Sequence, residues 1–343
     1  MKLSSIQTSS GETRTTVLLQ SDGRELLIDI NRAYTRLLRE RRDHGRAQAL
    51  ADALASRDML ELIEGGDDSL RAIREALDYA MEEIRTDADQ AVWIKAQLAY
   101  DLADVRWLPP VPRPGKIISV GANYRVHLEE FKPEEDTSAK GSVGRGLASA
   151  KTPPAFGKMP SGLTGHESSI AYPRWTNQLD YEAELGIVIG KRSKNLTKDN
   201  WNDAVFGYMN VNDVSMRETQ FEEMARGTLM LGKNADGACP SGPYVVTKDE
   251  VGNPQDLRIQ CWVNGEKRQD DSTIKMIFDI PAILMHYSQM TLFPGDVFTT
   301  GSPGGVGIVH RPPEPYLLKV GDTIEIEIEG LGRLRNTVVA DTV

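Results

Sequence analysis

The sequence has few of the residues that build thiol-based or disulfide-based proteins. Its 343 residues include two cysteines, five histidines and 6% aromatic residues. Two cysteines, Cys239 and Cys261, cannot form a disulfide framework or a four-thiolate metal site. Either thiol could be half of a bridge, but we expect both to be buried and free.

The chain also lacks an excess of positive charge and a long apolar run. Lys and Arg number 40 against 50 Asp and Glu, a formal net charge of −10. This balance argues against nucleic-acid binding, which is expected to use a basic patch, although a few arginines could still bind a small anion. No apolar run reaches the roughly 18–20 residues of a membrane helix, and the first residues lack the apolar core of a signal peptide. We therefore expect a soluble cytoplasmic protein with no nucleic-acid or membrane partner.

The first hundred residues differ from the rest in the secondary structure that they predict. Asp22-Gly23 between two apolar runs predicts a β-hairpin. A helix is expected from Ser69, with an apolar stripe formed by Leu70, Ile73, Leu77, Met81 and Ile84. Four prolines then fall within residues 109–114, which excludes a helix or a central strand there. The length suggests two domains, so we predict an N-terminal domain over 1–108, a Pro-rich linker over 109–115 and a second domain over 116–343.

Beyond the linker, short β-type runs alternate with turns. Strands are predicted in residues 116–121, 183–190, 243–247, 258–263, 296–301 and 323–330. Asn264-Gly265 predicts a tight hairpin, and two helices are expected, around Asn200–Ala204 and from Ile277 to Gln289. Residues 132–154 show no periodicity, which is typical of a mobile, functional loop.

One predicted strand carries two glutamates on the same face. Side chains alternate between the two faces of a strand, so Glu182 and Glu184 point the same way. The strand becomes apolar on both faces, and carboxylates entering a buried region need a cation or protons. The same spacing at Glu325, Glu327 and Glu329 alternates with isoleucines and predicts only a strand with one solvated face. The upstream pair therefore indicates either a surface pair or a site for a hard divalent ion such as Mg²⁺.

A second polar group follows another predicted strand. Asp213 is followed by Arg217 and Gln220, which would share a face with it if a helical turn starts at Ser215. Arg217 could bind a substrate carboxylate through its planar guanidinium. A capped helix with solvated charges explains this segment equally well.

Among the histidines, His127 is the candidate for chemistry. It follows a predicted strand, and Glu130 lies three residues later, where a helical turn allows a hydrogen bond that orients the imidazole as a general base for water. A surface ion pair would show the same spacing. Lys233 lies between an apolar run and a turn, and the Gly-rich residues 299–307 could offer backbone N–H groups to an anion. They lack the lysine and the spacing of a phosphate loop.

Taken together, these segments resemble the fumarylacetoacetate hydrolase family, in particular its bacterial and FAHD-like branch. The resemblance runs from about Pro110 to Val339 and covers eight motifs in order: PPVPRPGKIISVGANYRVHLEE, FGKMPSGLTG, LDYEAELGIVIGK, GYMNVNDVSMRETQ, GKNADGACPSGPYVVT, RIQCWVNGEKRQDDST, GDVFTTGSPGGVG and GDTIEIEIEGLGRLRNTV. It implies an α+β fold with a mixed β-roll, barrel-like catalytic domain, a smaller, mainly helical α/β N-terminal domain, and a homodimer.

The resemblance also implies roles for single residues. The family's metal ligands correspond to Glu182, Glu184 and Asp213, which would hold Mg²⁺ or Mn²⁺, with Ca²⁺ as an alternative. Its catalytic dyad corresponds to His127 and Glu130, and Lys233 matches the lysine that stabilises oxyanion or enolate charge. The substrate-binding positions correspond to Tyr124, Arg217, Gln220, Thr300 and Ser302. The segment between Glu130 and Phe156 is longer than is common in the family, which leaves the substrate open.

The implied activity is metal-dependent hydrolysis of a C–C bond in an acylpyruvate or another 1,3-dicarbonyl acid, as in the catabolism of aromatic compounds. His127 and Glu130 would activate water, while the metal and Lys233 would stabilise the departing enolate. The same site could instead serve a 2-oxo acid decarboxylase, hydratase or isomerase acting on oxaloacetate or a 2-hydroxy-dienoate. A non-catalytic, metal-stabilised module for binding organic acids is a further alternative, against which the dyad and Lys233 argue. In each case the partner is a small anionic oxo acid.

Overall fold

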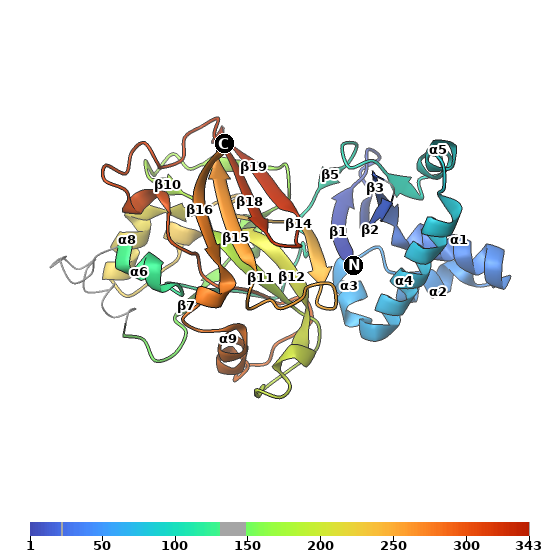
Figure 1. Ribbon diagram of the computed structural model, residues 1–343, viewed down its shortest axis with the longest axis horizontal. Helices are drawn as coiled ribbons and strands as arrows, with labels where there is room; N and C mark the ends of the chain where they lie inside the picture. Colours follow the sequence, from blue (N-terminus) through green and yellow to red (C-terminus); the bar gives the residue numbers. More distant parts are fainter. Residues whose placement is uncertain (22, 131–148, 343) are drawn as a thin grey trace.

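A computed structural model describes residues 1–21, 23–130 and 149–342 of the chain. Figure 1 shows that the N-terminal helices lie at one end of the molecule and that the rest consists mainly of strands with a few further helices. Most of the loop predicted over residues 132–154, and Asp22 of the predicted hairpin, lie outside the described residues. No helix within the described ranges has the length and apolar character needed to cross a membrane.

One large mixed sheet extends through the whole molecule. Its strands, in spatial order, are β4 (Ala99–Tyr100), β3 (Arg24–Asp29), β2 (Thr13–Ser21), β1 (Lys2–Gln7), β14 (Cys239–Thr247), β12 (Val205–Asn212), β11 (Ala183–Ile189), β17 (Val297–Thr299), β6 (Ile117–Val120) and β7 (Ala155–Lys158). The short β5 (Arg106–Trp107) and β8 (Leu163–Thr164) pair with β1 and β14. Because β1 pairs with β14, the N-terminal strands continue the sheet of the later segments. The predicted boundary at residues 109–115 stays a prediction.

A second sheet packs on the first. Its strands are β16 (Glu266–Ser272), β15 (Arg258–Val263), β18 (Thr323–Ile328), β19 (Arg333–Ala340) and β9 (Ser169–Tyr172). A two-stranded ribbon joins β10 (Leu179–Asp180) to β13 (Ser215–Met216). The expected α+β fold with a mixed β-roll is confirmed. Over the described residues, the sheets face each other as open layers and do not close into a barrel.

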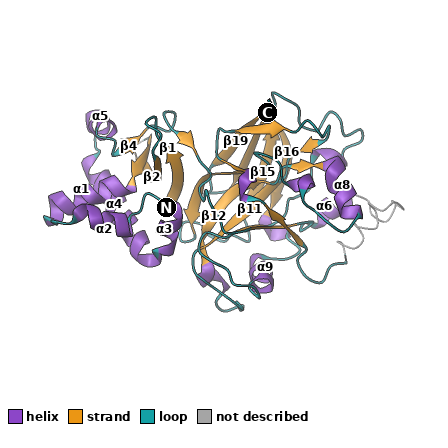
Figure 2. Ribbon diagram, turned by 180° about the vertical axis from the view of Figure 1, so that it is seen from behind, coloured by secondary structure: helices purple, strands orange, loops and turns teal. Residues whose placement is uncertain are grey.

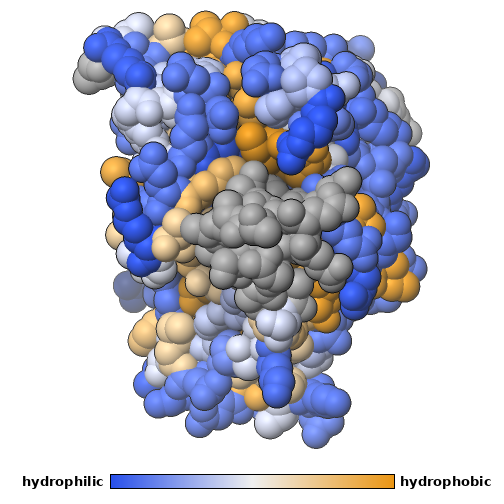
Figure 3. All heavy atoms as spheres, turned by 90° about the vertical axis from the view of Figure 1, so that its left-hand side faces the viewer, coloured by the Kyte–Doolittle hydropathy of each residue, from blue (hydrophilic) through white to orange (hydrophobic). Residues whose placement is uncertain are grey.

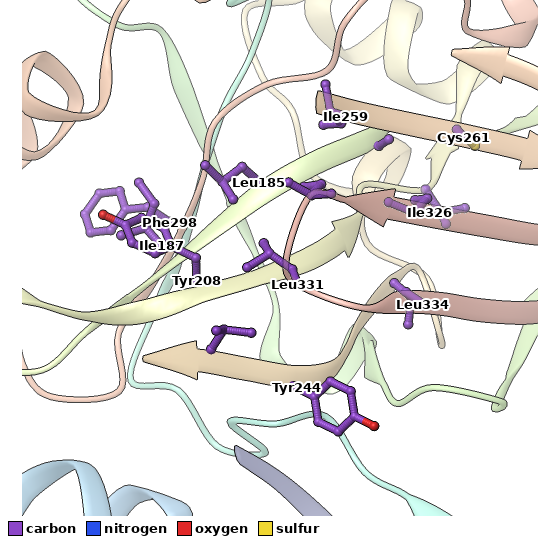
Figure 4. Packing of buried hydrophobic residues seen from close by; sticks show 14 of the residues in the cluster. Leu185, Ile187, Tyr208, Tyr244, Ile259, Cys261, Phe298, Ile326, Leu331 and Leu334 are labelled. Carbon is purple, nitrogen blue, oxygen red and sulfur yellow. The ribbon is translucent and has the colours of Figure 1, made fainter. Parts of the chain in front are cut away.

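The main core lies between these two sheets. Leu185 and Ile187 of β11 belong to the same buried cluster as Ile259 of β15 and Ile326 of β18 (Figure 4). Val188 points to the other face of β11 and belongs to the cluster that the N-terminal helices cover. Both faces of this strand are therefore buried, as the sequence predicts, and each fully buried side chain of this size contributes roughly 1.5–3 kcal/mol.

Eight α-helices surround the sheets in the described part of the chain. They are α1 (Ile30–Arg42), α2 (Ala47–Leu54), α3 (Met59–Glu64), α4 (Gly66–Glu83), α5 (Asp87–Lys95), α6 (Arg125–Glu130), α8 (Arg217–Ala225) and α9 (Ile280–Tyr287). Figure 2 shows α6 and α8 at the end of the molecule opposite to the N-terminal helices. The candidate site lies at this end.

The helix expected from Ser69 is α4, but its predicted apolar stripe is partly wrong. Ile73 and Ile84 are buried and Leu70 and Leu77 are partly buried, but Met81 is 45% exposed. The buried residues within α4 are Ser69, Ala72, Ile73, Ala76, Tyr79 and Ala80. Small alanines allow α4 to approach α1 closely, so this face packs against α1 in preference to the larger side chains.

The other predicted elements are found with adjusted ends. The hairpin of β2 and β3 and the turn at Asn264-Gly265, where both residues have positive φ, are confirmed. The helix expected around Asn200–Ala204 is a single 3₁₀ turn. Helix α9 begins at Ile280 because the side chain of Asp279 caps it. Both cysteines are buried and free, as predicted.

Candidate functional site

Three buried carboxylates meet where β11 and β12 lie side by side. The antiparallel register pairs Ala183 with Asn212, and beyond this pair the Asp213 N–H donates to the Glu182 carbonyl at 2.9 Å. Glu184 is two residues further along β11, on the same face as Glu182. Each of Glu182, Glu184 and Asp213 offers an oxygen within 4.8 Å of the others, and all three are buried. The register of the two strands therefore assembles the predicted ligand set.

Two buried lysines bind this carboxylate cluster. The Lys233 Nζ lies 2.7 Å from Glu182 Oε2, 2.7 Å from Asp213 Oδ2 and 2.8 Å from Ser215 Oγ. Lys158, at the end of β7, donates to Asp213 Oδ1 at 2.6 Å and to the Lys233 carbonyl at 2.6 Å. An ammonium has three donors, so Lys233 is fully engaged by protein acceptors. Burial would lower the pKa of Lys233, but Asp213 and Glu182 outweigh it and raise that pKa.

The two glutamates differ in their electrostatic surroundings. Burial favours a higher pKa for Glu182, but Lys233 and Arg217 outweigh burial and hold this pKa well below its usual range. Burial raises the pKa of Glu184, the other two carboxylates raise it further, and nearby cations do not offset them. The Gly301 N–H donates to Glu184 at 3.0 Å. Glu184 is thus the carboxylate whose charge the chain leaves least compensated.

Arg217 begins α8 and is almost fully buried. Its Nε donates to Asp180 Oδ2 at 2.8 Å, and its Nη1 lies 2.8 Å from Glu182 Oε1 and 2.9 Å from Gln220 Oε1. Its Nη2 has no hydrogen-bond partner among the residues the structure describes. The expected substrate-binding arginine therefore pairs first with carboxylates of the chain and keeps one nitrogen for another acceptor.

Replacing Arg217 with methionine is expected to lower the free energy of unfolding by about 3–5 kcal/mol, because buried Asp180 loses the cation that it pairs with. Urea unfolding followed by circular dichroism measures this change. Arg333→Met is the control: it breaks a half-exposed pair with Glu327 and should cost less than about 1 kcal/mol. Equal stability of the two variants would show that the buried pair contributes nothing.

Helix α6 places the predicted dyad beside the carboxylates. The His127 Nδ1 lies 3.7 Å from Glu130 Oε2, and His127 is buried. Residues 301–305 link the dyad to the carboxylates, since the Gly305 N–H donates to Glu130 and the Gly301 N–H donates to Glu184. The structure thus brings the dyad and the predicted metal ligands together.

The Gly-rich segment after β17 offers its N–H groups to anions, but these anions belong to the chain. The donations run from Gly301 to Glu184 (3.0 Å), from Gly305 to Glu130 (2.9 and 3.1 Å), and from Gly307 and Ile308 to Asp180 (2.7 and 3.0 Å). A positive φ of +85° and a close approach to Asn123 make glycine necessary at Gly301. The segment therefore acts as a scaffold for protein carboxylates.

The remaining predicted substrate-binding residues offer hydroxyl groups. The hydroxyls of Tyr124 and Thr300 are buried and have no hydrogen-bond partner in the described ranges. Burial, together with Glu184, raises the pKa of Tyr124, so this hydroxyl stays protonated. Ser302 accepts a hydrogen bond from Gln269 at 2.9 Å. Since buried polar groups are normally paired, the first two hydroxyls are candidates for contacting a ligand.

Two buried charged residues of the candidate site, Lys158 and Asp180, were not assigned a role by the sequence analysis. Lys158 lies in the motif FGKMPSGLTG and Asp180 in LDYEAELGIVIGK, so the available signal was a charged residue at the end of a short strand. The structure places both in the polar network of the site. Figure 3 shows this end of the molecule, whose described surface is mainly polar with some apolar residues.

Comparison with known proteins places this geometry among related enzymes. The family described as Fumarylacetoacetate (FAA) hydrolase C-terminal matches residues 116–339. A curated relative, "Oxaloacetate tautomerase FAHD2B, mitochondrial" of Bos taurus, is 35% identical over 94% of this chain and 100% of its own. "Oxaloacetate tautomerase YisK" of Bacillus subtilis (strain 168) is 38% identical over 70% of this chain and 75% of its own.

Solved structures with the same fold include enzymes named for different reactions. The fumarylacetoacetate hydrolase from psychrophilic Exiguobacterium antarcticum has a TM-score of 0.71 and 32% identity, covering 99% of this chain and 100% of its own. The maleylpyruvate hydrolase from Sphingobium sp. SYK-6, in complex with manganese (II) ion and pyruvate, has a TM-score of 0.68 and 26% identity, covering all of both chains.

Proposed function

Since this chain belongs to the fumarylacetoacetate hydrolase family, we propose that it is a metal-dependent isomerase that interconverts the keto and enol forms of oxaloacetate or a closely similar 2-oxo acid. The observation that carries the proposal is the buried triad of Glu182, Glu184 and Asp213, which residues 301–305 link to Glu130 and so to the dyad with His127. The names of the Bos taurus and Bacillus subtilis relatives support tautomerisation over the C–C bond hydrolysis that the sequence analysis favours.

The donor set of the triad fits a hard divalent ion. All three ligands are carboxylates, which Mg²⁺ and Mn²⁺ accept. A bound cation would stabilise the charged form of Glu184 most, because burial and the carboxylates of Asp213 and Glu182 raise the pKa of Glu184. We propose Mg²⁺ or Mn²⁺, and the manganese in the Sphingobium enzyme supports the second of these. When bound, such an ion would act as a Lewis acid on a 2-oxo group.

The charge of the site suits a dianionic substrate. Four buried carboxylates (Asp180, Glu182, Glu184 and Asp213) face three buried cations (Lys158, Arg217 and Lys233). One formal negative charge remains, and a divalent ion would change it to one positive charge. A buried site with a net positive charge attracts an oxo acid with two carboxylates.

Tautomerisation requires the transfer of one proton. The C3–H bond of the keto acid breaks, its electron pair forms the C2=C3 double bond, and the 2-oxo oxygen takes up a proton. His127, oriented by Glu130, takes the proton from C3 and returns it to the oxygen. The hydroxyl of Tyr124, kept protonated by its raised pKa, donates a hydrogen bond to the developing enolate, and Arg217 Nη2 binds a substrate carboxylate. Lys233 keeps Glu182 and Asp213 in place and adds positive charge near the enolate.

Hydrolysis of a C–C bond is the second candidate. The Exiguobacterium antarcticum structure, which covers 99% of this chain, is named for such a reaction. The same dyad could remove a proton from water, and both reactions pass through an enolate. Water attack would consume an acylpyruvate and release two acids, whereas tautomerisation leaves the carbon skeleton intact.

The test follows the ultraviolet absorbance of enol oxaloacetate after mixing with the purified protein. We expect accelerated conversion to the keto form with Mg²⁺ or Mn²⁺, loss of this acceleration after chelation, and no pyruvate above the uncatalysed rate. A parallel screen of acylpyruvates measures cleavage. Cleavage of an acylpyruvate without any effect on oxaloacetate would contradict the proposal and favour the hydrolase.

The stabilisation of the protein by Mn²⁺ is expected to increase as the pH rises from acidic to neutral. The pKa of Glu184 is raised in the folded state, so without a cation the protein loses stability as the pH rises through that pKa. Mn²⁺ binds the charged form and restores the lost stability. The difference in Tm with and without Mn²⁺ measures the effect. A difference that is constant with pH would contradict it.

We also propose that the protein is a cytoplasmic homodimer, as the sequence analysis expects. The family resemblance supports the homodimer. Light scattering of the purified chain measures the assembly, and a monomer at micromolar concentration would contradict it.

A further inference from the structure

The turn formed by residues 303–308 contacts Glu130 of the dyad on one side and Asp180, next to the buried carboxylates, on the other. We propose that this turn, anchored by Asp180, is the positioning element that fixes Glu130 and, through Glu130, His127. The catalytic consequence rests on the proposed function, while the positioning itself can be measured without turnover. Sequence analysis associates this Gly-rich segment only with anion binding, and the structure shows that it binds carboxylates of its own chain.

On the dyad side, the turn leaves no space for a side chain. The Gly305 N–H donates to both carboxylate oxygens of Glu130. A Cβ at Gly305, where φ is +97°, would lie 2.2 Å from the Arg268 carbonyl oxygen. A Cβ at Gly304 would lie 2.8 Å from Glu130 Oε1 and 2.8 Å from Val126 Cγ1. Both positions therefore require glycine to keep the turn against α6.

On the carboxylate side, Asp180 holds the other end of the turn. Its Oδ1 accepts the Gly307 N–H at 2.7 Å, and its Oδ2 accepts the Ile308 N–H at 3.0 Å and Arg217 Nε at 2.8 Å. Asp180 is fully buried, and only Tyr181 separates it from Glu182 in the sequence. The turn is thereby tied to the segment that carries the first predicted metal ligand.

A third contact lies between these two. The buried Tyr181 hydroxyl donates to the Gly305 carbonyl at 3.0 Å, so both the N–H and the carbonyl of Gly305 are fixed. Helix α6, which carries Glu130, has only six residues and cannot hold its own geometry through helix propensity. The position of the Glu130 carboxylate is therefore set by the turn.

The chemical consequence concerns which nitrogen of His127 faces the substrate. The Glu130 carboxylate lies 3.7 Å from His127 Nδ1, and its negative charge favours a proton on that nitrogen, which leaves Nε2 as the basic nitrogen. Moving Glu130 away from the turn removes this preference. A misplacement of about 1 Å in such an arrangement can cost about a hundredfold in rate.

The test compares Gly304→Ala with Glu130→Gln, the double variant, and Gly252→Ala as the control. A Cβ at Gly252 would meet nothing within 4 Å. Full-length protein labelled with ¹³C only at histidine Cε1, with Mg²⁺, gives five imidazole cross-peaks in a ¹H–¹³C spectrum, since the chain has five histidines, and His127→Gln assigns one of them. We expect Gly304→Ala to move the His127 cross-peak in the same direction as Glu130→Gln, and Gly252→Ala to leave it in place.

Kinetics supply the second readout. Gly304→Ala should lower kcat for oxaloacetate tautomerisation about tenfold to a hundredfold with little change in KM. The double variant should be no slower than Glu130→Gln alone, because both changes act through one carboxylate. A double variant whose loss of kcat equals the product of the two single losses would overturn the proposal.

The two possible failures can be told apart. An unmoved His127 cross-peak in a folded Gly304→Ala variant overturns the positioning role, whatever the activity. A wild-type protein without effect on oxaloacetate overturns the proposed function, and the cross-peak comparison still decides the positioning role. Where Gly304→Ala does not fold, Tyr181→Phe replaces it: loss of the hydrogen bond to Gly305 should move the same cross-peak, and no movement overturns the proposal.

Discussion

Replacement of His127 by glutamine is expected to lower kcat for the keto–enol conversion of oxaloacetate by about 10²–10⁴-fold, the usual contribution of a positioned acid–base group. The imidazole is buried beside Glu130 and close to Glu182. Glutamine has a similar size but cannot take a proton from C3. Affinity for Mn²⁺ should change little, because the proposed ligands are the three carboxylates.

The matched control is His44→Gln, which changes an exposed histidine of the N-terminal region in the same way. It should retain the kcat and KM of the wild type. If His127→Gln retained full activity, the proton would be transferred by another group and the dyad would have no role in the reaction. Electron paramagnetic resonance of bound Mn²⁺ separates loss of chemistry from loss of the metal.

Glu184→Gln is expected to produce two opposite effects. Mn²⁺ affinity should fall by at least about a hundredfold, because even groups outside the ligand set cost 10–100-fold when removed, and metal-dependent activity should be lost. In the absence of metal, the variant should be more stable than the wild type at neutral pH. The reason is that burial and two neighbouring carboxylates raise the pKa of Glu184, so its charge costs free energy above that pKa.

Glu325→Gln is the control for this substitution. Glu325 belongs to a glutamate pair with the same spacing, but it lies half-buried on β18 and pairs with Arg333. Its replacement should change neither Mn²⁺ affinity nor activity. A Glu184→Gln variant that is less stable than the metal-free wild type would show that Glu184 is a structural group and would contradict the assignment. Isothermal titration with Mn²⁺ and urea unfolding without metal provide the two measurements.

Local sequence patterns could predict the strands and part of the site. The period of two places Glu182 and Glu184 on one face, and the apolar second half of that strand indicates burial, which β11 confirms. The isoleucine alternation likewise separates the Glu325–Glu329 ladder from a buried site, and Ile324, Ile326 and Ile328 are buried. These inferences depend only on neighbouring residues.

Contacts between distant segments could not be predicted in this way. Asp213 joins the glutamates because β12 pairs with β11 in one register, which no local pattern specifies. Lys158 reaches Asp213 from β7, at one edge of the large sheet. The sequence analysis assigns the three carboxylates to a metal and Lys233 to the substrate, whereas the structure pairs Lys233, Lys158 and Arg217 with carboxylates of this cluster.

The reaction type is the point on which the sequence is least informative. Hydrolysis, decarboxylation and tautomerisation all use an enolate beside a carboxylate site, so the same residues predict each of them. The preference for tautomerisation comes from relatives with that name. The unpartnered atoms of Tyr124, Thr300 and Arg217 mark where a substrate can bind, but they serve any of the three reactions.

The central claim is that this site transfers a proton at C3 of a 2-oxo acid without breaking a C–C bond. The most direct measurement is the rate of deuterium incorporation at C3 of oxaloacetate in D₂O, followed by ¹H NMR with wild-type protein, with Glu184→Gln and without protein. The account predicts faster loss of the C3 proton signal with wild type and Mg²⁺ only, while the total of keto and enol acid stays constant. Exchange at the uncatalysed rate, or exchange accompanied by pyruvate formation above that rate, would contradict it.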